Sequence, residues 1–157
     1  MGKLLFASLA LMAPMLAFAT PEVGDKVVYD TYMGRQNSTV TKEIVSNLGS
    51  NEFTVHYTTT NPSFDYNYNV TIDPNNTQCA SAQSIEKCKA LTSRPDELAS
   101  IETIKIANKD VIACHISTPG PQDWWYGDVP FCLIKKEINP TDPNGRLSAE
   151  LSDFVKL

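Results

Sequence analysis

The sequence predicts a mainly β (α+β) fold: a curved antiparallel sheet or incomplete barrel of about eight strands, with a short helical insert acting as a lid. Three observations support this prediction. Large apolar residues alternate with short polar ones along several segments, which is the period of a strand with one buried face. Clusters of Asn, Asp, Pro and Gly separate these segments, as turns do. One internal segment, 81–91, has helical spacing instead.

The N-terminal part of the chain is predicted to form a meander of four strands. In the segment 64–72 every second residue is large and apolar, and the segment 53–58 repeats the pattern. The link 59–63 has the Thr, Asn, Pro and Ser composition of a turn, so we expect these two strands to pair antiparallel. Two further strands are predicted upstream, at 26–33 and 39–48.

The middle of the chain predicts a short helix. After a turn at 73–76, the segment 81–91 combines Ala, Gln, Glu and Lys with Ile85, Cys88 and Leu91 at spacings of three. This spacing is typical of one face of a helix. We therefore expect the chain to leave the sheet here and to cover one of its faces.

The C-terminal part predicts a return to strands. Turn-forming stretches at 108–110, 119–122 and 139–145 divide it into alternating or apolar segments. The predicted strands of this part are 100–107, 111–118, 124–129, 131–138 and 146–151.

The first nineteen residues, 1–19, have the composition of a signal peptide. Lys3 precedes an apolar run, and Ala17 and Ala19 are small residues at the positions that signal peptidase recognises. We expect an extracytoplasmic protein, periplasmic or secreted, in which residues 20–157 form a single β-rich domain. The apolar run is too short for a stable membrane span, so no membrane-spanning segment is expected after its removal.

The charge balance disfavours two classes of partner. The formal net charge is −5 at pH 7, and the densest basic cluster is the pair Lys135-Lys136. Nucleic acids and anionic lipid surfaces both bind through clustered Lys and Arg side chains. We therefore expect no nucleic-acid partner and no binding to an anionic lipid surface.

The cysteines predict disulfides. Cys79, Cys88, Cys114 and Cys132 all follow the predicted leader, and an even number of cysteines in an exported chain indicates disulfide bonds. Three pairings are possible, and sequence proximity favours Cys79 with Cys88 and Cys114 with Cys132. Zinc is the competing ligand, but neither spacing is C-x2-4-C and the two histidines are not spaced as a ligand pair. We expect two disulfides and no metal site.

The sequence predicts no catalytic residues. His56 and His115 are the histidines of the chain, and no G-x-S-x-G, H-E-x-x-H, P-loop or C-x-x-C motif is present. A catalytic base needs an orienting acid and a nucleophile or metal within hydrogen-bond range. We therefore expect no enzymatic activity and no cofactor.

The tandem tryptophans Trp124 and Trp125 lie in one predicted strand. Neighbouring side chains of a strand point to opposite faces, so the two indoles are not expected in the same core layer. One of them is expected on the second face, either beneath the helical insert or at an exposed rim. A large aromatic side chain with a polar handle at a rim is a common anchor for ligands and partners.

The segment from Trp124 to Glu137 is similar to the W-x-S-x-x-V-P-x-G-x-V-K-x-E stretch of small exported β proteins related to the lipoprotein-carrier (LolA/LolB-like) group. The resemblance covers about the last fifty residues, and Cys132 stands at the position where that group usually has Gly. It implies an incomplete antiparallel barrel with a helical lid and an apolar interior that shelters acyl chains or other hydrophobic ligands. It implies no catalytic residue.

Two functions follow as hypotheses. The first is a binding or carrier module for a hydrophobic small molecule or lipid, held in an apolar concave pocket. The alternative is a non-catalytic structural or protein-interaction domain with a fully packed core, which recognises an envelope protein through strand edges and the tryptophan rim. The residues predicted to line the pocket are Phe53, Val55, Tyr57, Phe64, Tyr66, Tyr68, Trp124 and Trp125.

Overall fold

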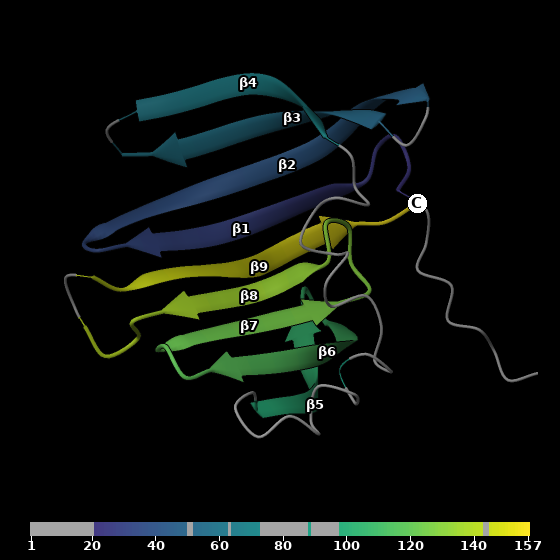
Figure 1. The fold of residues 1–157 in the computed structure, drawn as a ribbon. Helices are drawn as coiled ribbons and strands as arrows, with labels where there is room; N and C mark the ends of the chain where they lie inside the picture. The colour runs from purple at the N-terminus through teal and green to yellow at the C-terminus, as the bar shows by residue number, and fades with distance from the viewer. Residues whose placement is uncertain (1–20, 50–51, 63, 73–87, 89–97, 143–144) are drawn as a thin grey trace, which may run out of the picture.

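The computed structural model describes residues 21–49, 52–62, 64–72, 88, 98–142 and 145–157 (Figure 1). Within this part of the chain, nine antiparallel strands form one curved sheet that does not close into a barrel. The mainly β prediction is confirmed, with nine strands in place of about eight. The strands are β1 Lys26–Met33, β2 Gln36–Gly49, β3 Glu52–Asn61, β4 Phe64–Ile72, β5 Leu98–Ile106, β6 Lys109–Thr118, β7 Gln122–Gly127, β8 Leu133–Ile138 and β9 Leu147–Val155.

The sheet consists of two meanders joined at its centre. The strand order is β4-β3-β2-β1-β9-β8-β7-β6-β5, so the first and last strands of the chain pair with each other (Figure 1). Eight partner positions link β1 to β9, from Lys26 opposite Val155 to Met33 opposite Leu147. This pairing brings the apolar residues of both meanders onto one continuous surface.

The two faces of the sheet differ in chemistry, as the alternation predicts. One face, named the aromatic face below, carries two cross-strand rows that run over β9, β1, β2, β3 and β4. The opposite face of β2, β3 and β4 carries several short polar side chains, for example Thr41, Thr58 and Asn67. The two rows of the aromatic face are Phe154, Val27, Lys42, Tyr57 and Tyr68, and Leu151, Tyr29, Val40, Thr59 and Tyr66.

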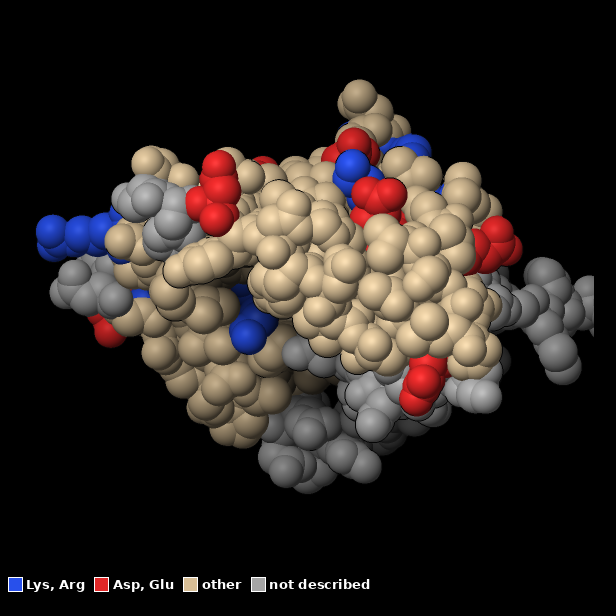
Figure 2. Space-filling view, turned by 90° about the horizontal axis from the view of Figure 1, so that it is seen from above, with Lys and Arg blue, Asp and Glu red and all other residues tan. Residues whose placement is uncertain are grey.

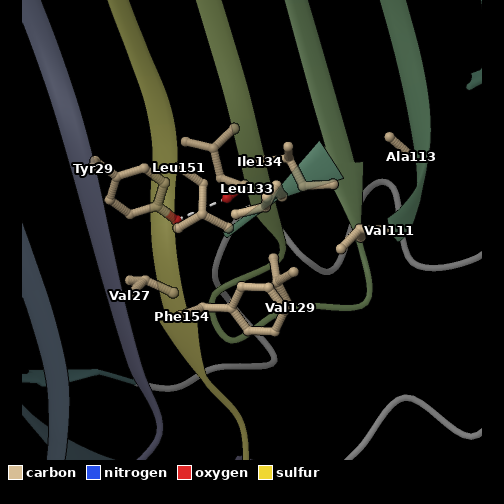
Figure 3. Close-up of a cluster of buried hydrophobic side chains, with 10 residues drawn as sticks. Val27, Tyr29, Val111, Ala113, Val129, Leu133, Ile134, Leu151 and Phe154 are labelled. Carbon is tan, nitrogen blue, oxygen red and sulfur yellow. Dashed lines mark hydrogen bonds between the residues drawn. The ribbon is translucent and has the colours of Figure 1, made fainter. Parts of the chain in front are cut away.

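The main core lies where the two meanders meet (Figure 3). Val27 and Tyr29 of β1 pack with Leu151 and Phe154 of β9 and with Ile134 of β8. Each fully buried aliphatic side chain of this kind stabilises the fold by about 1.5–3 kcal/mol. The polar end of Tyr29 is also satisfied, because its hydroxyl donates a 2.8 Å hydrogen bond to the carbonyl oxygen of Leu133, drawn as a dashed line in Figure 3.

A second core cluster is formed by β2 and β3 of the first meander. It contains Ile44 of β2 with Phe53 and Val55 of β3, and Tyr57 and Phe131 pack against it. Irregularities in the β2–β3 register occur beside this cluster, between Ile44 and Ser46 and between Asn47 and Gly49. Bulges of this kind increase strand twist, which accords with the curvature of the sheet.

The turn between β7 and β8 differs from the prediction. The strand predicted at 131–138 begins at Leu133, because Phe131 and Cys132 have left-handed backbone angles, with φ of 61° and 58°. Four backbone hydrogen bonds hold this turn, among them those from the Cys132 amide to the Val129 carbonyl and from the Leu133 amide to the Phe131 carbonyl. The preceding strand correspondingly ends at Gly127 rather than at 129.

The disulfide pairing predicted from sequence proximity is wrong. Cys88 is bonded to Cys114, with 5.8 Å between the two Cα atoms, and Cys132 is disulfide-bonded as well. The pairing fails because Cys114 lies within β6, where Tyr126 of β7 and Ile101 of β5 are its cross-strand neighbours. Cys79 lies outside the described residues.

The predicted lid also lies almost wholly outside the described residues. Of the segment 81–91 only Cys88 is described, in helical conformation. The short helical lid is therefore not seen in the described part of the structure. The signal peptide predicted for 1–19 likewise lies outside it.

Candidate ligand-binding face

The aromatic face contains most of the residues predicted to line a pocket, at different depths. Phe53 and Val55 are fully buried in the second core cluster. Tyr57 is half-buried and stacks on Tyr68 across the β3–β4 pair, with ring centroids 5.3 Å apart. Phe64 is the first residue of β4 and pairs with Asn61.

Edge strand β4 leaves large side chains exposed on this face. The exposed fraction is 58% for Tyr66, 50% for Tyr68 and 37% for Val70. Val70 shares a cross-strand row with the buried Val55 and Ile44. The rows of Tyr66 and Tyr68 pass through half-buried residues of β3 and β2 and reach the buried Tyr29 and Val27 of β1. The apolar surface therefore continues from the packed core out to the edge of the sheet.

The two tryptophans occupy opposite faces, as strand alternation predicts. Trp124 joins the aromatic face through a row of pairs with Lys136 of β8, Ala149 of β9 and Thr31 of β1. It stacks on Tyr126, with ring centroids 6.2 Å apart. Trp125 has Lys135 as its cross-strand neighbour and points to the opposite face, and its predicted role in ligand binding stays a prediction.

Lys42 is the residue of this face that the sequence prediction missed. Its ammonium nitrogen lies 5.4 Å from the ring centroids of both Tyr29 and Tyr57 and 5.7 Å from that of Phe131. These are cation–π distances. The signal that identifies it is the alternation Val40, Lys42, Ile44 in β2, which places a lysine between two apolar residues of the same face.

Burial controls the electrostatics around Lys42. Desolvation lowers the pKa of the Lys42 ammonium below its usual value, because the rings replace water around the charge. Burial, followed by the proximity of Tyr68, raises the pKa of Tyr57, and burial raises that of Tyr126 to about 12. Tyrosines with raised pKa values are neutral at pH 7. Among the described residues of β1 to β4, Lys42 is the only charged side chain on the aromatic face.

A polar cluster occupies the opposite face of β5, β6 and β7. His115 Nδ1 is 2.9 Å from Glu102 Oε1, and its Nε2 is 3.0 Å from Asp123 Oδ1. The imidazole stacks on Trp125 at 4.1 Å, and the Trp125 indole donates a 3.2 Å hydrogen bond to Glu102 Oε2. Both imidazole nitrogens therefore lie within hydrogen-bond distance of a carboxylate, one on β5 and one on β7.

The Glu102 carboxylate has hydrogen-bonding contacts with Ser100, His115 and Trp125. Desolvation raises its pKa, but hydrogen bonds from Trp125, Ser100 and His115 together outweigh desolvation and bring the pKa below its usual value. Ser100, the cross-strand partner of His115, donates its hydroxyl hydrogen to Glu102. We interpret this cluster as a clamp between strands.

The second histidine, His56, contacts Asn69 across the β3–β4 pair at 2.7 Å.

A hollow of about 710 Å³ lies at the end of the sheet where the β1–β2 and β3–β4 hairpins turn. Thr, Ser and Asn side chains line it, together with Asp30 and Glu150. Among the predicted ligand-binding residues whose side chains the structure describes, none lines this hollow. This hollow is therefore distinct from the part of the aromatic face that Tyr57, Tyr66 and Tyr68 form.

The Cys88–Cys114 disulfide indicates an oxidising compartment, since such bonds persist mainly outside the cytosol. In the described ranges, no helix has the length and apolar character needed to cross a bilayer. Comparison with protein-family models, curated proteins and solved structures finds no significant match to this chain.

Proposed function

We propose that this chain is an extracytoplasmic binding or carrier module that holds a hydrophobic ligand, a lipid or an acyl chain, against its aromatic face. The observation that carries the proposal is the exposure of Tyr66, Tyr68 and Val70 in rows that are continuous with the buried core. Contiguous apolar surface on a monomeric protein marks a binding site more often than an accident of folding.

The chemistry of the face suits a ligand of this kind. Tyrosine rings offer large, rigid contact areas with a polar end. They therefore tolerate water when the site is empty and pack against an acyl chain when the site is occupied. On the far side of the sheet centre, Trp124 and Tyr126 add a second stacked aromatic pair to the same face. An acyl chain lying across these rows would cover side chains that the fold leaves half-exposed.

A fluorescence titration tests this proposal. The probe is cis-parinaric acid, a polyene fatty acid that becomes fluorescent when it leaves water and that accepts excitation from tryptophan. We expect saturable binding by the purified chain, with energy transfer from Trp124. The Tyr68→Ser variant should bind about tenfold more weakly, because it loses one aromatic contact of about 1–1.5 kcal/mol.

The matched control lies one residue away. Asn67 precedes Tyr68 in β4 and pairs with Thr58 on the polar face. Asn67→Ser should leave the affinity within twofold of the unaltered chain. Absence of saturable binding, or equal losses in the two variants, would count against a ligand site on the aromatic face.

One observation favours the alternative of protein recognition. Strand β4 is an edge of the sheet, and among its nine residues Asp65 is the only charged one. Figure 2 looks down on this edge and shows mostly uncharged residues with scattered charges. Exposed edges with few charges can accept a strand from another chain. Cross-linking in the native compartment tests this alternative. A specific protein linked to β4, together with no binding of cis-parinaric acid by the purified chain, would favour protein recognition.

A further inference from the structure

We infer that the ligand of the aromatic face is a single-chain fatty acid whose carboxylate pairs with the ammonium group of Lys42. This inference rests on the proposed function and adds the chemical class of the ligand. It follows from where Lys42 lies, from what the other lysines do and from the charge of the whole chain.

Lys42 lies at the centre of an apolar row. Its cross-strand neighbours on the same face are Val27 of β1 and Tyr57 of β3, and the row continues to Tyr68 at the edge. Three rings surround the ammonium group, and the residue as a whole is only partly buried. A ligand that lies along this row from the sheet edge therefore contacts the rings of Tyr68 and Tyr57 first and then reaches the positive charge of Lys42.

Several other lysines have a carboxylate partner, whereas Lys136, like Lys42, lies over an aromatic ring. Lys26 pairs with Glu43 at 3.9 Å, Lys105 with Asp110 at 3.8 Å and Lys135 with Glu137 at 3.2 Å. Among the residues that the structure describes, no carboxylate and no hydrogen-bond acceptor pairs with the Lys42 ammonium. A desolvated cation without an anion is costly, so a ligand that supplies the anion gains the interaction that the protein itself does not make.

The charge count favours a carboxylate over a phosphate. A carboxylate carries one negative charge and matches one ammonium group, whereas a phosphate monoester near pH 7 carries more charge and further acceptor oxygens. The whole chain has a net charge of −5, so its long-range field repels anions. A preference for an acid must therefore come from a local cation on the face.

Paired probes of one chain length test the inference. The probes are cis-parinaric acid and its methyl ester, which differ only in the charge of the head group. We expect the unaltered chain to bind the acid at least tenfold more tightly than the ester. In Lys42→Met the two affinities should agree within twofold, with ester binding retained, and Lys42→Arg should keep the preference for the acid.

Lys136 provides the matched control. It lies on the same face, with its ammonium nitrogen 4.5 Å from the ring centroid of Trp124. Lys136→Met should keep the preference for the acid. Loss of the preference in Lys136→Met alone, or its persistence in Lys42→Met, would overturn the assignment to Lys42.

Two further outcomes separate this inference from the proposed function. Equal binding of acid and ester by the unaltered chain would reject the carboxylate and leave a hydrophobic site. Binding of neither probe would reject the site itself.

A competition experiment tests the choice of carboxylate over phosphate. Hexadecanoic acid should displace cis-parinaric acid more strongly than hexadecyl phosphate does, and the reverse order would overturn the choice of carboxylate.

Discussion

The Lys42 ammonium lies beside three aromatic rings, those of Tyr29, Tyr57 and Phe131, and this placement removes water from a charged group. Cation–π contacts return about 0.5–2 kcal/mol, but desolvation dominates the pKa of Lys42, which is lowered. An apolar residue of similar length would suit the same position better. The retention of a charge there is understandable if the charge binds something.

The Lys42→Met variant should therefore be more stable than the unaltered chain at pH 7. Because the folded-state pKa of Lys42 lies below its unfolded value, the protonated lysine opposes folding at neutral pH, and this opposition fades as pH rises through the folded pKa. We expect the free energy of unfolding in urea to rise by about 1 kcal/mol. Lys105→Met, an exposed control, should change it by less than about 0.5 kcal/mol. A clear destabilisation by Lys42→Met would show that the lysine is structural.

Gly127 gives a second prediction at this scale. A Cβ atom at Gly127 would lie 2.5 Å from Ile134 Cδ1 and 2.8 Å from the backbone oxygen of Ile112. The isoleucine side chain can move, but the backbone oxygen cannot do so without disturbing β6. We expect Gly127→Ala to lower the free energy of unfolding by about 1–3 kcal/mol, measured by urea denaturation. Gly120→Ala is the control, because a Cβ there meets no atom closer than 4.0 Å.

At the scale of elements, the sequence predicts the strands well and their ends poorly. The bounds of β1 and β4 agree with the prediction, because alternation runs through the whole of each. The start of β8 could not be predicted, since Phe131 and Cys132 adopt left-handed angles that their residue types do not signal. Strand β9 continues to Val155, beyond the predicted end at 151, because pairing with β1 supports it.

The clamp of Glu102, His115 and Asp123 holds β5, β6 and β7 together and predicts a pH dependence. The folded-state pKa of Glu102 is below its unfolded value, so its contribution to stability is present above the unfolded pKa and is lost as pH falls through the folded one. As pH falls below the usual pKa of a glutamate and through the lower folded-state pKa, Glu102→Gln should lose less stability than the unaltered chain. Chemical denaturation at several pH values measures this; parallel curves for the two proteins would contradict it.

At the scale of the whole molecule, topology decides what local patterns cannot. Alternation identifies Tyr57, Tyr66 and Tyr68 as residues of one face, but only the β1–β9 pairing places Trp124 on that face as well. The sequence prediction missed Lys42 because it considered only the large apolar positions. The disulfide pairing failed for a similar reason, since proximity in sequence does not show which segment lies over β6.

The Cys88–Cys114 bond ties a segment between the two meanders to β6 and should stabilise the fold strongly. With a sequence separation of 26 residues, the chain-entropy model gives about 3 to 4 kcal/mol. We expect Cys88→Ser to lower the unfolding midpoint markedly, and non-reducing peptide mapping to recover the fragment that joins Cys88 to Cys114. Recovery of Cys88 linked to any other cysteine would contradict this connectivity.

The most direct measurement is native mass spectrometry of the chain purified from its own compartment without detergent. A hydrophobic ligand on the aromatic face predicts a mass above that of the polypeptide, an excess that disappears on denaturation and is identified as a fatty acid in the organic extract. A population with only the polypeptide mass, which also takes up no added fatty acid, would contradict the binding function.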